Sequence, residues 1–217
     1  MLKNLLRKEL CLAMHPTGAL MLALSAMVLI PNYPYTVIFF YSTLSLFFTC
    51  LQGRENNDVS YTLTLPVARR DAVRGRFALA ALIELAQLAL TGAFCLVRRS
   101  LPLPANAAGL EANLSLLGAG FLLFGVFNLV FFPRYYRNIE KVGAPFALAS
   151  VVFFVLVAAG EALEHAVPFV RDRLDSLDPA YLPARLAALA AGLVLWLLLT
   201  ALAYRRSVKF FSRLDIA

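Results

Sequence analysis

Glu161, Glu164 and His165 are the residues whose types and spacing come closest to a catalytic arrangement. Residues four apart share one face of a helix, and zinc proteases use such a face to present two histidines with a glutamate. The only other histidine is His15, far away in the sequence. With one histidine at hand, neither a metal site nor a nucleophilic triad can be completed. We therefore predict no catalytic and no metal-binding residue, and interpret the cluster as an acidic cap on an apolar helix.

The lysines indicate whether the chain can bind a nucleotide. A phosphate-binding loop has the pattern G-x-x-x-x-G-K-[ST], in which backbone donors hold the phosphates and the lysine neutralises them. The chain has four lysines, and none stands in that context; they are Lys3, Lys8, Lys141 and Lys209. We predict that this chain binds no cofactor, so any ATP that drives it must be bound by another chain.

Three polar side chains stand within apolar segments. Glu84 lies inside a long apolar run, where a charged side chain is energetically expensive in lipid, and Gln87 lies one turn further on the same helix face. Asn128 adds a polar group to the next apolar run. Residues of this kind line substrate paths, and the sequence predicts such a path here. The alternative is that they form hydrogen bonds between helices and fix their packing.

The stretch 53–76 has the densest pattern in the chain. Polar residues end one apolar run, a moderately apolar segment from Val59 follows, and a basic segment leads into the next apolar run. An apolar segment ringed by charge is suited to docking on a partner protein. The alternative is a basic membrane anchor with incidental leucines. The residues that we predict to contact a partner are Glu55, Leu63, Leu65, Pro66, Arg69 and Arg70.

The elements that must hold these residues are apolar helices. Hydrophobic residues make up 61% of the chain and charged residues 15%, whereas soluble domains have roughly 45–50% and 25%. This excess is too large for one buried core and indicates a surface that faces lipid. The predicted fold class is therefore all-α, a polytopic membrane protein with six transmembrane helices. Their expected ranges are 17–32, 35–52, 77–97, 113–132, 142–160 and 186–204.

The basic residues predict the orientation of these helices. With both termini in the cytosol, the inner segments hold 15 of the 20 lysines and arginines, as the positive-inside rule requires. The pair Arg98 and Arg99 runs against the rule, but it is a minority. The formal charge of +7 is thus explained by topology, and we expect no nucleic acid as a partner.

Two stretches are expected to lie on the membrane surface, within a single domain that covers residues 1–217. The stretch 161–185 mixes apolar and charged residues and is broken by prolines, which predicts short outer interfacial helices. The stretch 1–15 predicts an inner interfacial helix, which is either a moving elbow or a passive anchor. The apolar residues that recur on it at helical spacing are Leu2, Leu5, Leu6, Leu10 and Ala13.

Small residues predict where transmembrane helices approach each other closely. Ala188 with Gly192, and Gly118 with Gly125, stand at spacings that place small side chains on helix faces. Close approach would suit helices that slide, and it would equally suit helices that only pack.

The loop sequences resemble those of a known family. Leu63 to Val73, followed by Arg74 to Phe77, is similar to the loop after the second helix of small bacterial type-2 ABC export permeases, the group of the lantibiotic and modulin exporters. Phe132 to Tyr136, before Lys141, resembles the loop after their fourth helix. Arg76 replaces the family's usual lysine, and Asn138 stands where the family prefers glycine.

The resemblance implies a permease subunit of the bacterial plasma membrane. It implies two kinds of partner, namely cytosolic ABC ATPase subunits that bind ATP and Mg, and a second permease subunit. Residues 55–66 would form the coupling helix that sits in the ATPase, and the cargo would be an amphipathic or peptide-like molecule. Two other functions stay open. One is an intramembrane enzyme, such as a protease or a lipid head-group transferase, and the other is a non-transporting adaptor or immunity subunit.

Overall fold

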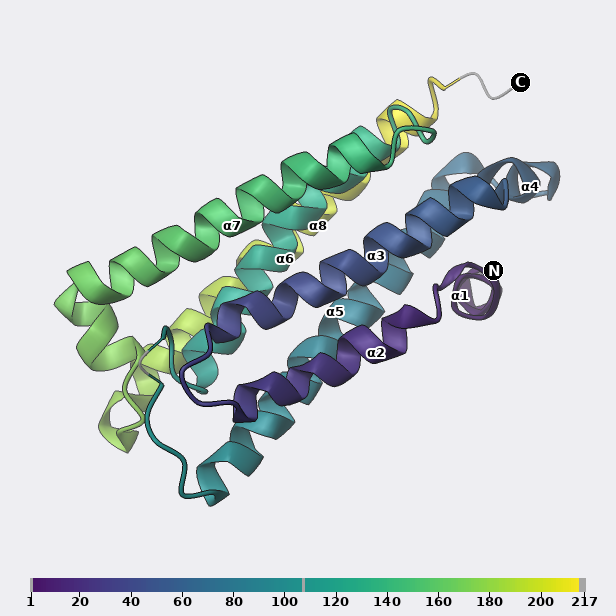
Figure 1. The fold of residues 1–217 in the computed structure, drawn as a ribbon. Coiled ribbons are helices and arrows are strands. Elements are labelled where there is room, and N and C mark those ends of the chain that lie inside the picture. Colours follow the sequence, from purple (N-terminus) through teal and green to yellow (C-terminus); the bar gives the residue numbers. More distant parts are fainter. Residues whose placement is uncertain (1, 107, 215–217) are drawn as a thin grey trace.

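The computed structural model describes residues 2–106 and 108–214, and within this part every regular element is helical. The all-α prediction is therefore confirmed. The longer helices run side by side as a bundle (Figure 1). The α-helices are α1 (Leu2–Lys8), α2 (Thr17–Ala23), α3 (Ile38–Glu55), α4 (Asp58–Thr64), α5 (Arg69–Ser100), α6 (Leu114–Tyr135), α7 (Gly143–Ala166) and α8 (Leu182–Phe211).

Five of the helical segments are long and apolar enough to cross a membrane. They are Tyr35–Glu55, Arg69–Ser100, Leu114–Tyr135, Gly143–Ala166 and Pro179–Phe211. The sixth expected crossing, 17–32, is a shorter apolar helix over Thr17–Leu29, in which α2 continues as a 3₁₀-helix over Leu24–Leu29. The helix ends before Pro31, and Asn32 takes a left-handed φ of 56° to turn the chain toward α3.

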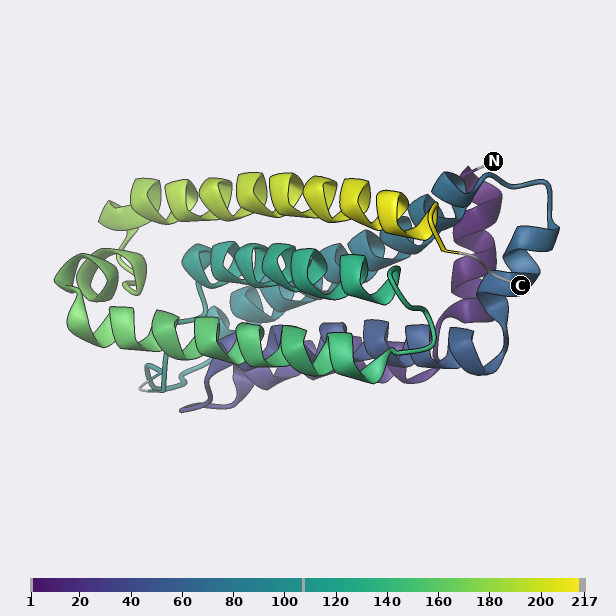
Figure 2. The same cartoon turned by 90° about the horizontal axis from the view of Figure 1, so that it is seen from above.

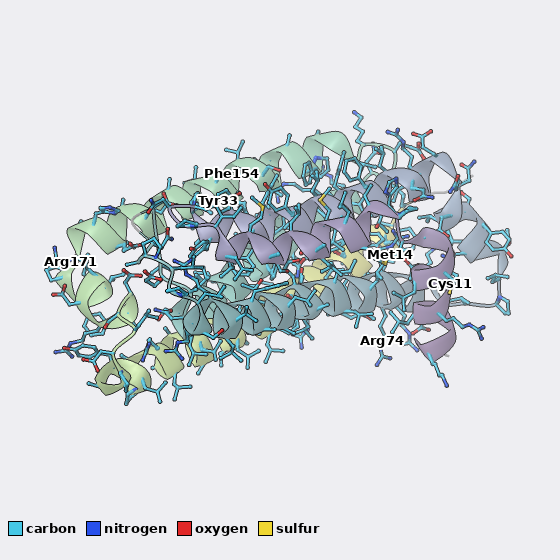
Figure 3. The ribbon with its side chains drawn as sticks, turned by 60° about the horizontal axis from the view of Figure 1, so that its bottom comes forward. Cys11, Met14, Tyr33, Arg74, Phe154 and Arg171 are labelled. Atoms are coloured by element: carbon cyan, nitrogen blue, oxygen red, sulfur yellow. The ribbon has the colours of Figure 1, made fainter. Side chains whose placement is uncertain are left out.

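The bundle has two different ends. The terminal end carries α1, α4, the turn at 136–142 and the C-terminal residues of α8 (Figures 1 and 2). The distal end carries the turn at 30–34, the connecting residues 101–106 and 108–113, and the connection 167–181. Helix α1 lies across the terminal end, nearly perpendicular to the bundle (Figure 2). In Figure 3, Cys11 and Arg74 lie at the terminal end and Arg171 lies at the distal end.

The N-terminal segment is an α-helix that passes into a π-helical turn over Glu9–Ala13, after which Met14 is extended. Leu5 and Ala13 are buried, whereas Leu10 is exposed. The face that meets the bundle therefore includes Glu9, which is 4% exposed. The side chain of Leu2, which the sequence places on the apolar face, lies outside the described residues, as do residues 1, 107 and 215–217 of the expected domain.

Helix α6 occupies the centre of the bundle and packs most tightly against α8. A Cβ atom on Gly192 of α8 would lie 2.2 Å from the carbonyl oxygen of Gly118 in α6, and one on Gly118 would lie 2.6 Å from that of Ala188. The two backbones are thus in direct contact. Gly125 also faces α8, since its Cβ would lie 3.0 Å from Cα of Trp196. The close approach predicted from the small residues is present.

The stretch 161–185 differs from the expected surface helices. Residues 161–166 continue α7, and residues 182–185 belong to α8. Between them lie one π-helical turn, Val170–Leu174, and one 3₁₀ turn, Pro179–Tyr181. The prolines explain this division, because proline is tolerated in the first turn of a helix but not in its interior.

Candidate functional site

Helix α4 is placed by two backbone features. Asn57 adopts a left-handed φ of 50°, which turns the chain after α3, and Asp58 begins α4 with an acidic side chain at the positive end of the helix. Leu65 is extended, as the residue before a proline prefers. Helix α5 then begins at Arg69. The predicted docking segment is therefore a seven-residue helix held between two long helices.

The side chains around α4 divide into exposed and inward groups. Leu65 is 39% exposed, and Glu55, Pro66 and Arg70 are also exposed. Tyr61, which the sequence analysis did not select, is 59% exposed and adds an aromatic ring to this surface. Leu63 is half-buried and packs against the hydrophobic core. We call the exposed set the α4 surface; its members are Glu55, Tyr61, Leu65, Pro66 and Arg70.

Arg69 points elsewhere, because it caps the C-terminal end of α8. One guanidinium nitrogen donates to the carbonyl oxygens of Phe211 at 3.2 Å, Ser212 at 3.4 Å and Leu214 at 2.7 Å. A cation at the negative end of a helix is favourable. The hydroxyl of Tyr204 also donates to the backbone carbonyl of Arg70 at 3.4 Å. Arg69 therefore binds the start of α5 to α8, and Arg70 is the arginine of the pair that is exposed.

A buried charge cluster lies beneath α4 and was missed by sequence reasoning. Arg76 of α5 is 3% exposed; its Nε lies 2.8 Å from Oε2 of Glu9, and its Nη2 donates to Oδ2 of Asp58 at 2.8 Å. Nζ of Lys8 pairs with Oδ1 of Asp58 at 2.5 Å and donates to the Thr62 hydroxyl at 2.8 Å. The four charges, Lys8, Glu9, Asp58 and Arg76, form what we call the charge cluster.

The charge cluster connects three elements: the N-terminal helix, α4 and α5. Lys8 and Glu9 come from the N-terminal helix, Asp58 from α4 and Arg76 from α5, and Arg76 also donates to the backbone carbonyl of Thr49 in α3 at 3.3 Å. Buried ion pairs hold their geometry strongly, because separating them leaves an uncompensated charge. The one signal in the sequence is the position of Glu9, four residues from both Leu5 and Ala13 on the buried face.

The intramembrane residues Glu84 and Asn128 meet in the interior of the bundle. Oε2 of Glu84 accepts a hydrogen bond from Nε1 of Trp196 at 2.7 Å and another from Nδ2 of Asn128 at 3.2 Å. The same amide of Asn128 donates to the Thr200 hydroxyl at 3.1 Å. These hydrogen bonds join α5, α6 and α8, and we call the four residues, Glu84, Asn128, Trp196 and Thr200, the Glu84 polar group. Trp196 and Thr200 were not selected from the sequence, because an indole in an apolar run carries no distinct signal.

Some hydrogen-bonding atoms in and beside the Glu84 polar group have no partner. Within the part of the chain that the structure describes, Oε1 of Glu84, Oδ1 of Asn128 and both side-chain polar atoms of Gln87 are buried without a hydrogen-bond partner. Gln87 is fully buried one turn after Glu84 but is not bonded to it. Buried polar atoms without partners are rare in native proteins. The sequence-predicted path residues are thus close in the fold, with two of the three in contact.

Comparison with known proteins identifies the family. A family profile described as ABC-2 family transporter protein matches residues 4–212, nearly the whole chain. The chain belongs to the ABC-2 transporter family. The resemblance to type-2 ABC permeases is thereby confirmed, and the apolar helices make this ABC-2 transporter a multi-pass membrane protein. No curated protein and no solved structure matches the chain.

Membership of the ABC-2 family assigns the chain to transport subunits rather than to enzymes. Nδ1 of His165 lies 2.8 Å from the backbone oxygen of Glu161 in its own helix. Among the described residues, no group of three or more histidine, cysteine, aspartate or glutamate side chains is arranged to hold a metal ion. The structural features of this ABC-2 transporter that call for explanation are the α4 surface, the charge cluster and the Glu84 polar group.

Proposed function

We propose that the chain is the permease subunit of an ATP-driven exporter of an amphipathic or peptide-like substrate. It works with cytosolic ABC ATPase subunits, which bind ATP and Mg, and with a second permease subunit that is identical or different. The α4 surface is the contact with the ATPase. Both termini lie in the cytosol of a bacterial cell, as the distribution of basic residues predicts.

The observation that carries this proposal is the combination of an exposed α4 with a rigid attachment beneath it. Tyr61 and Leu65 present apolar area to solvent at the terminal end, while Asp58 of the same helix is ion-paired to Lys8 and Arg76. A short helix that is exposed to a partner on one side and ion-paired to other helices on the other side can transmit a displacement from the partner to those helices. A displaced α4 therefore carries α1 and α5 with it.

Helix α5 gives this displacement a route into the membrane. Arg76 and Glu84 stand eight residues apart on α5, about 12 Å along the helix axis. Glu84 is hydrogen-bonded to α6 and α8. ATP binding by the partner must favour one bundle arrangement through a difference in contact energy, and we propose that this route transmits it. Glu84, Gln87 and Asn128 then line the substrate path.

The experiment that tests the proposal is co-purification of the tagged chain with ABC ATPase subunits from the cells that naturally make it. Leu65→Glu should reduce recovery of the ATPase by about tenfold or more, since a charge in a docked apolar contact costs roughly 1–3 kcal/mol. Leu177→Glu is the matched control, because Leu177 is 42% exposed at the distal end against 39% for Leu65. We expect Leu177→Glu to leave recovery unchanged.

Three results would count against the proposal. Equal recovery with both variants would remove the α4 surface from the contact. A chemical activity of the isolated chain would support the intramembrane enzyme. A complex that hydrolyses ATP but moves no amphipathic substrate in vesicles would support the adaptor or immunity subunit.

A further inference from the structure

A groove lies between α6 and α7 at the distal end and is not part of the proposed coupling route. Its volume is about 180 Å³ and its wall is almost wholly apolar. Leu122 and Leu123 come from α6, and Leu156 and Leu163 come from α7. An apolar cavity of 150 Å³ is large enough to bind a molecule such as benzene. This groove can therefore hold a segment of one alkyl chain.

Two polar side chains in the wall have unused hydrogen-bonding atoms. Glu164 is 6% exposed and Thr36 is 7% exposed, and both line the groove. Within the described residues, Oε2 of Glu164 and Oγ1 of Thr36 are buried without a hydrogen-bond partner. A carboxylate buried beside apolar surface without a partner is energetically expensive. Its presence here indicates a ligand that supplies the missing donor.

The charge around Glu164 is predominantly negative. Glu161 lines the same groove, and Asp175 and Glu111 lie close enough to act on Glu164 electrostatically. The backbone amide of Glu111 donates to Oδ1 of Asp175 at 2.6 Å, and burial raises the pKa of Asp175. None of these four carboxylates forms an ion pair with a described residue. His165 acts on Glu164 with the opposite sign, whereas Arg98 and Arg99 lie beside Glu111 in a neighbouring pocket that Glu164 does not line. The groove therefore attracts a cation.

We propose that the α6–α7 groove binds a single-chain amphiphile with a cationic amine. The amine donates to the unpartnered Oε2 of Glu164 and to Oγ1 of Thr36, and the alkyl chain lies along the leucines of α6 and α7. The site is assigned from this chain's own residues, so it goes beyond the proposed function and is testable without an ATPase.

The geometry favours a single-chain amine over a bilayer phospholipid. A phospholipid with an amine head group carries its phosphate between the amine and its chains, so the phosphate would be brought toward Glu161 and Glu164. Like charges at such short range are unfavourable. The groove volume of about 180 Å³ also leaves little room for the second chain that a phospholipid carries.

Photolabelling of the purified full-length chain in phosphatidylcholine nanodiscs tests the site. The probe is dodecylamine that carries a diazirine in its alkyl chain, and adducts are located on peptides by mass spectrometry. We expect saturable adducts on α6 and α7. Unlabelled dodecylamine should compete at least about tenfold more strongly than dodecanol, because its charged head group forms a charge-assisted hydrogen bond that the alcohol cannot form.

Two substitutions distinguish the contribution of the Glu164 charge from that of the free volume of the groove. Glu164→Gln removes the charge at nearly constant shape, and Gly160→Leu fills the groove. A Cβ on Gly160 would meet no atom within 4 Å, and the same is true of Gly143 in the same helix, far from the groove. Gly143→Leu is therefore the matched control. We expect labelling to fall about tenfold in the first two variants and to be unchanged in the third.

The competition in the wild-type protein decides the proposal even if a variant fails to fold. Equal competition by dodecanol would show that no charge is recognised and would overturn the proposal. Suppression of labelling by phosphatidylethanolamine in the nanodisc would assign the groove to bilayer lipid instead. Wild-type labelling in both Glu164→Gln and Gly160→Leu would place the bound amine elsewhere, and so would an equal loss in Gly143→Leu.

Discussion

Arg76 is the residue on which the contacts beneath α4 converge. It is paired with Glu9 and Asp58 and is bonded to the backbone of α3. A lysine would offer one ammonium group at this position, whereas the planar guanidinium reaches three partners at once. The arginine that departs from the family pattern therefore contacts three partners from three different elements in this chain.

Arg76→Gln should destabilise the protein by roughly 3–5 kcal/mol, because it leaves Glu9 buried without its nearest counter-charge and Asp58 paired with Lys8 alone. Arg74→Gln is the matched control, since Arg74 is exposed two residues earlier on α5, and surface changes usually stay within about 0.5 kcal/mol. Thermal unfolding of the purified proteins in one detergent measures the difference. Equal melting temperatures would mean that the cluster does not hold α4 in place.

Glu84→Gln tests the substrate path. The amide keeps an acceptor oxygen for Trp196 and Asn128 while the charge is lost, so we expect normal assembly. Transport by the assembled complex should fall about tenfold, the effect of losing a charge-assisted contact of about 1.5 kcal/mol. Trp196 is the only tryptophan, and unchanged emission would show that the local packing is preserved. Full transport activity would leave Glu84 with a packing role alone.

Sequence reasoning found some of these residues and missed others for physical reasons. A charged residue in an apolar run is visible without a structure, so Glu84 was found. Trp196 was missed because an apolar run hides an aromatic donor. In the sequence, α2, α3 and α4 lie between Glu9 and Arg76. Their pairing therefore depends on how the chain folds back. Arg69 was assigned to a partner protein, but its contacts are with α8.

At the scale of the elements, the pair α6 and α8 is the most sensitive contact. Gly192→Ala should destabilise the protein by about 1–3 kcal/mol, since the new methyl group would lie 2.2 Å from a backbone carbonyl that cannot rotate away. Gly160→Ala should stabilise it by about 0.5–1 kcal/mol, because that position is open and alanine favours the helix. Thermal unfolding should therefore shift in opposite directions. Shifts of the same sign would contradict the direct backbone contact.

The helical type of the elements and the centres of the apolar helices could be predicted, but the ends of the helices could not. Hydropathy identifies only the apolar centre of a helix, so 77–97 became a 32-residue helix whose polar ends extend beyond it. The first crossing was expected to reach residue 32 but stops at Leu29. Turn chemistry at Pro31 and Asn32 decides that end, and a hydrophobicity pattern does not report it.

At the scale of the whole molecule, the structure groups α4 with α1 and the C-terminal end of α8, and the basic residues predict that this end faces the cytosol. Tyr61→Cys in a Cys11→Ser background places one exposed thiol on α4, because Cys50 and Cys95 are buried. A membrane-impermeant maleimide should label it in inside-out vesicles and not in intact cells. Asp172→Cys, at the distal end, should show the reverse pattern. Labelling of Tyr61→Cys on intact cells would invert the topology and remove the ATPase contact with it.

The brevity of the first apolar helix has a consequence for the surrounding lipid. Seven α-helical and six 3₁₀ residues extend over about 22 Å, whereas the hydrocarbon layer is about 30 Å thick. Leu20 is 61% exposed on this helix, so an apolar side chain faces outward there. Hydrophobic mismatch of this kind is relieved by local thinning of the bilayer. We therefore expect the hydrocarbon layer around the protein to be thinnest beside α2.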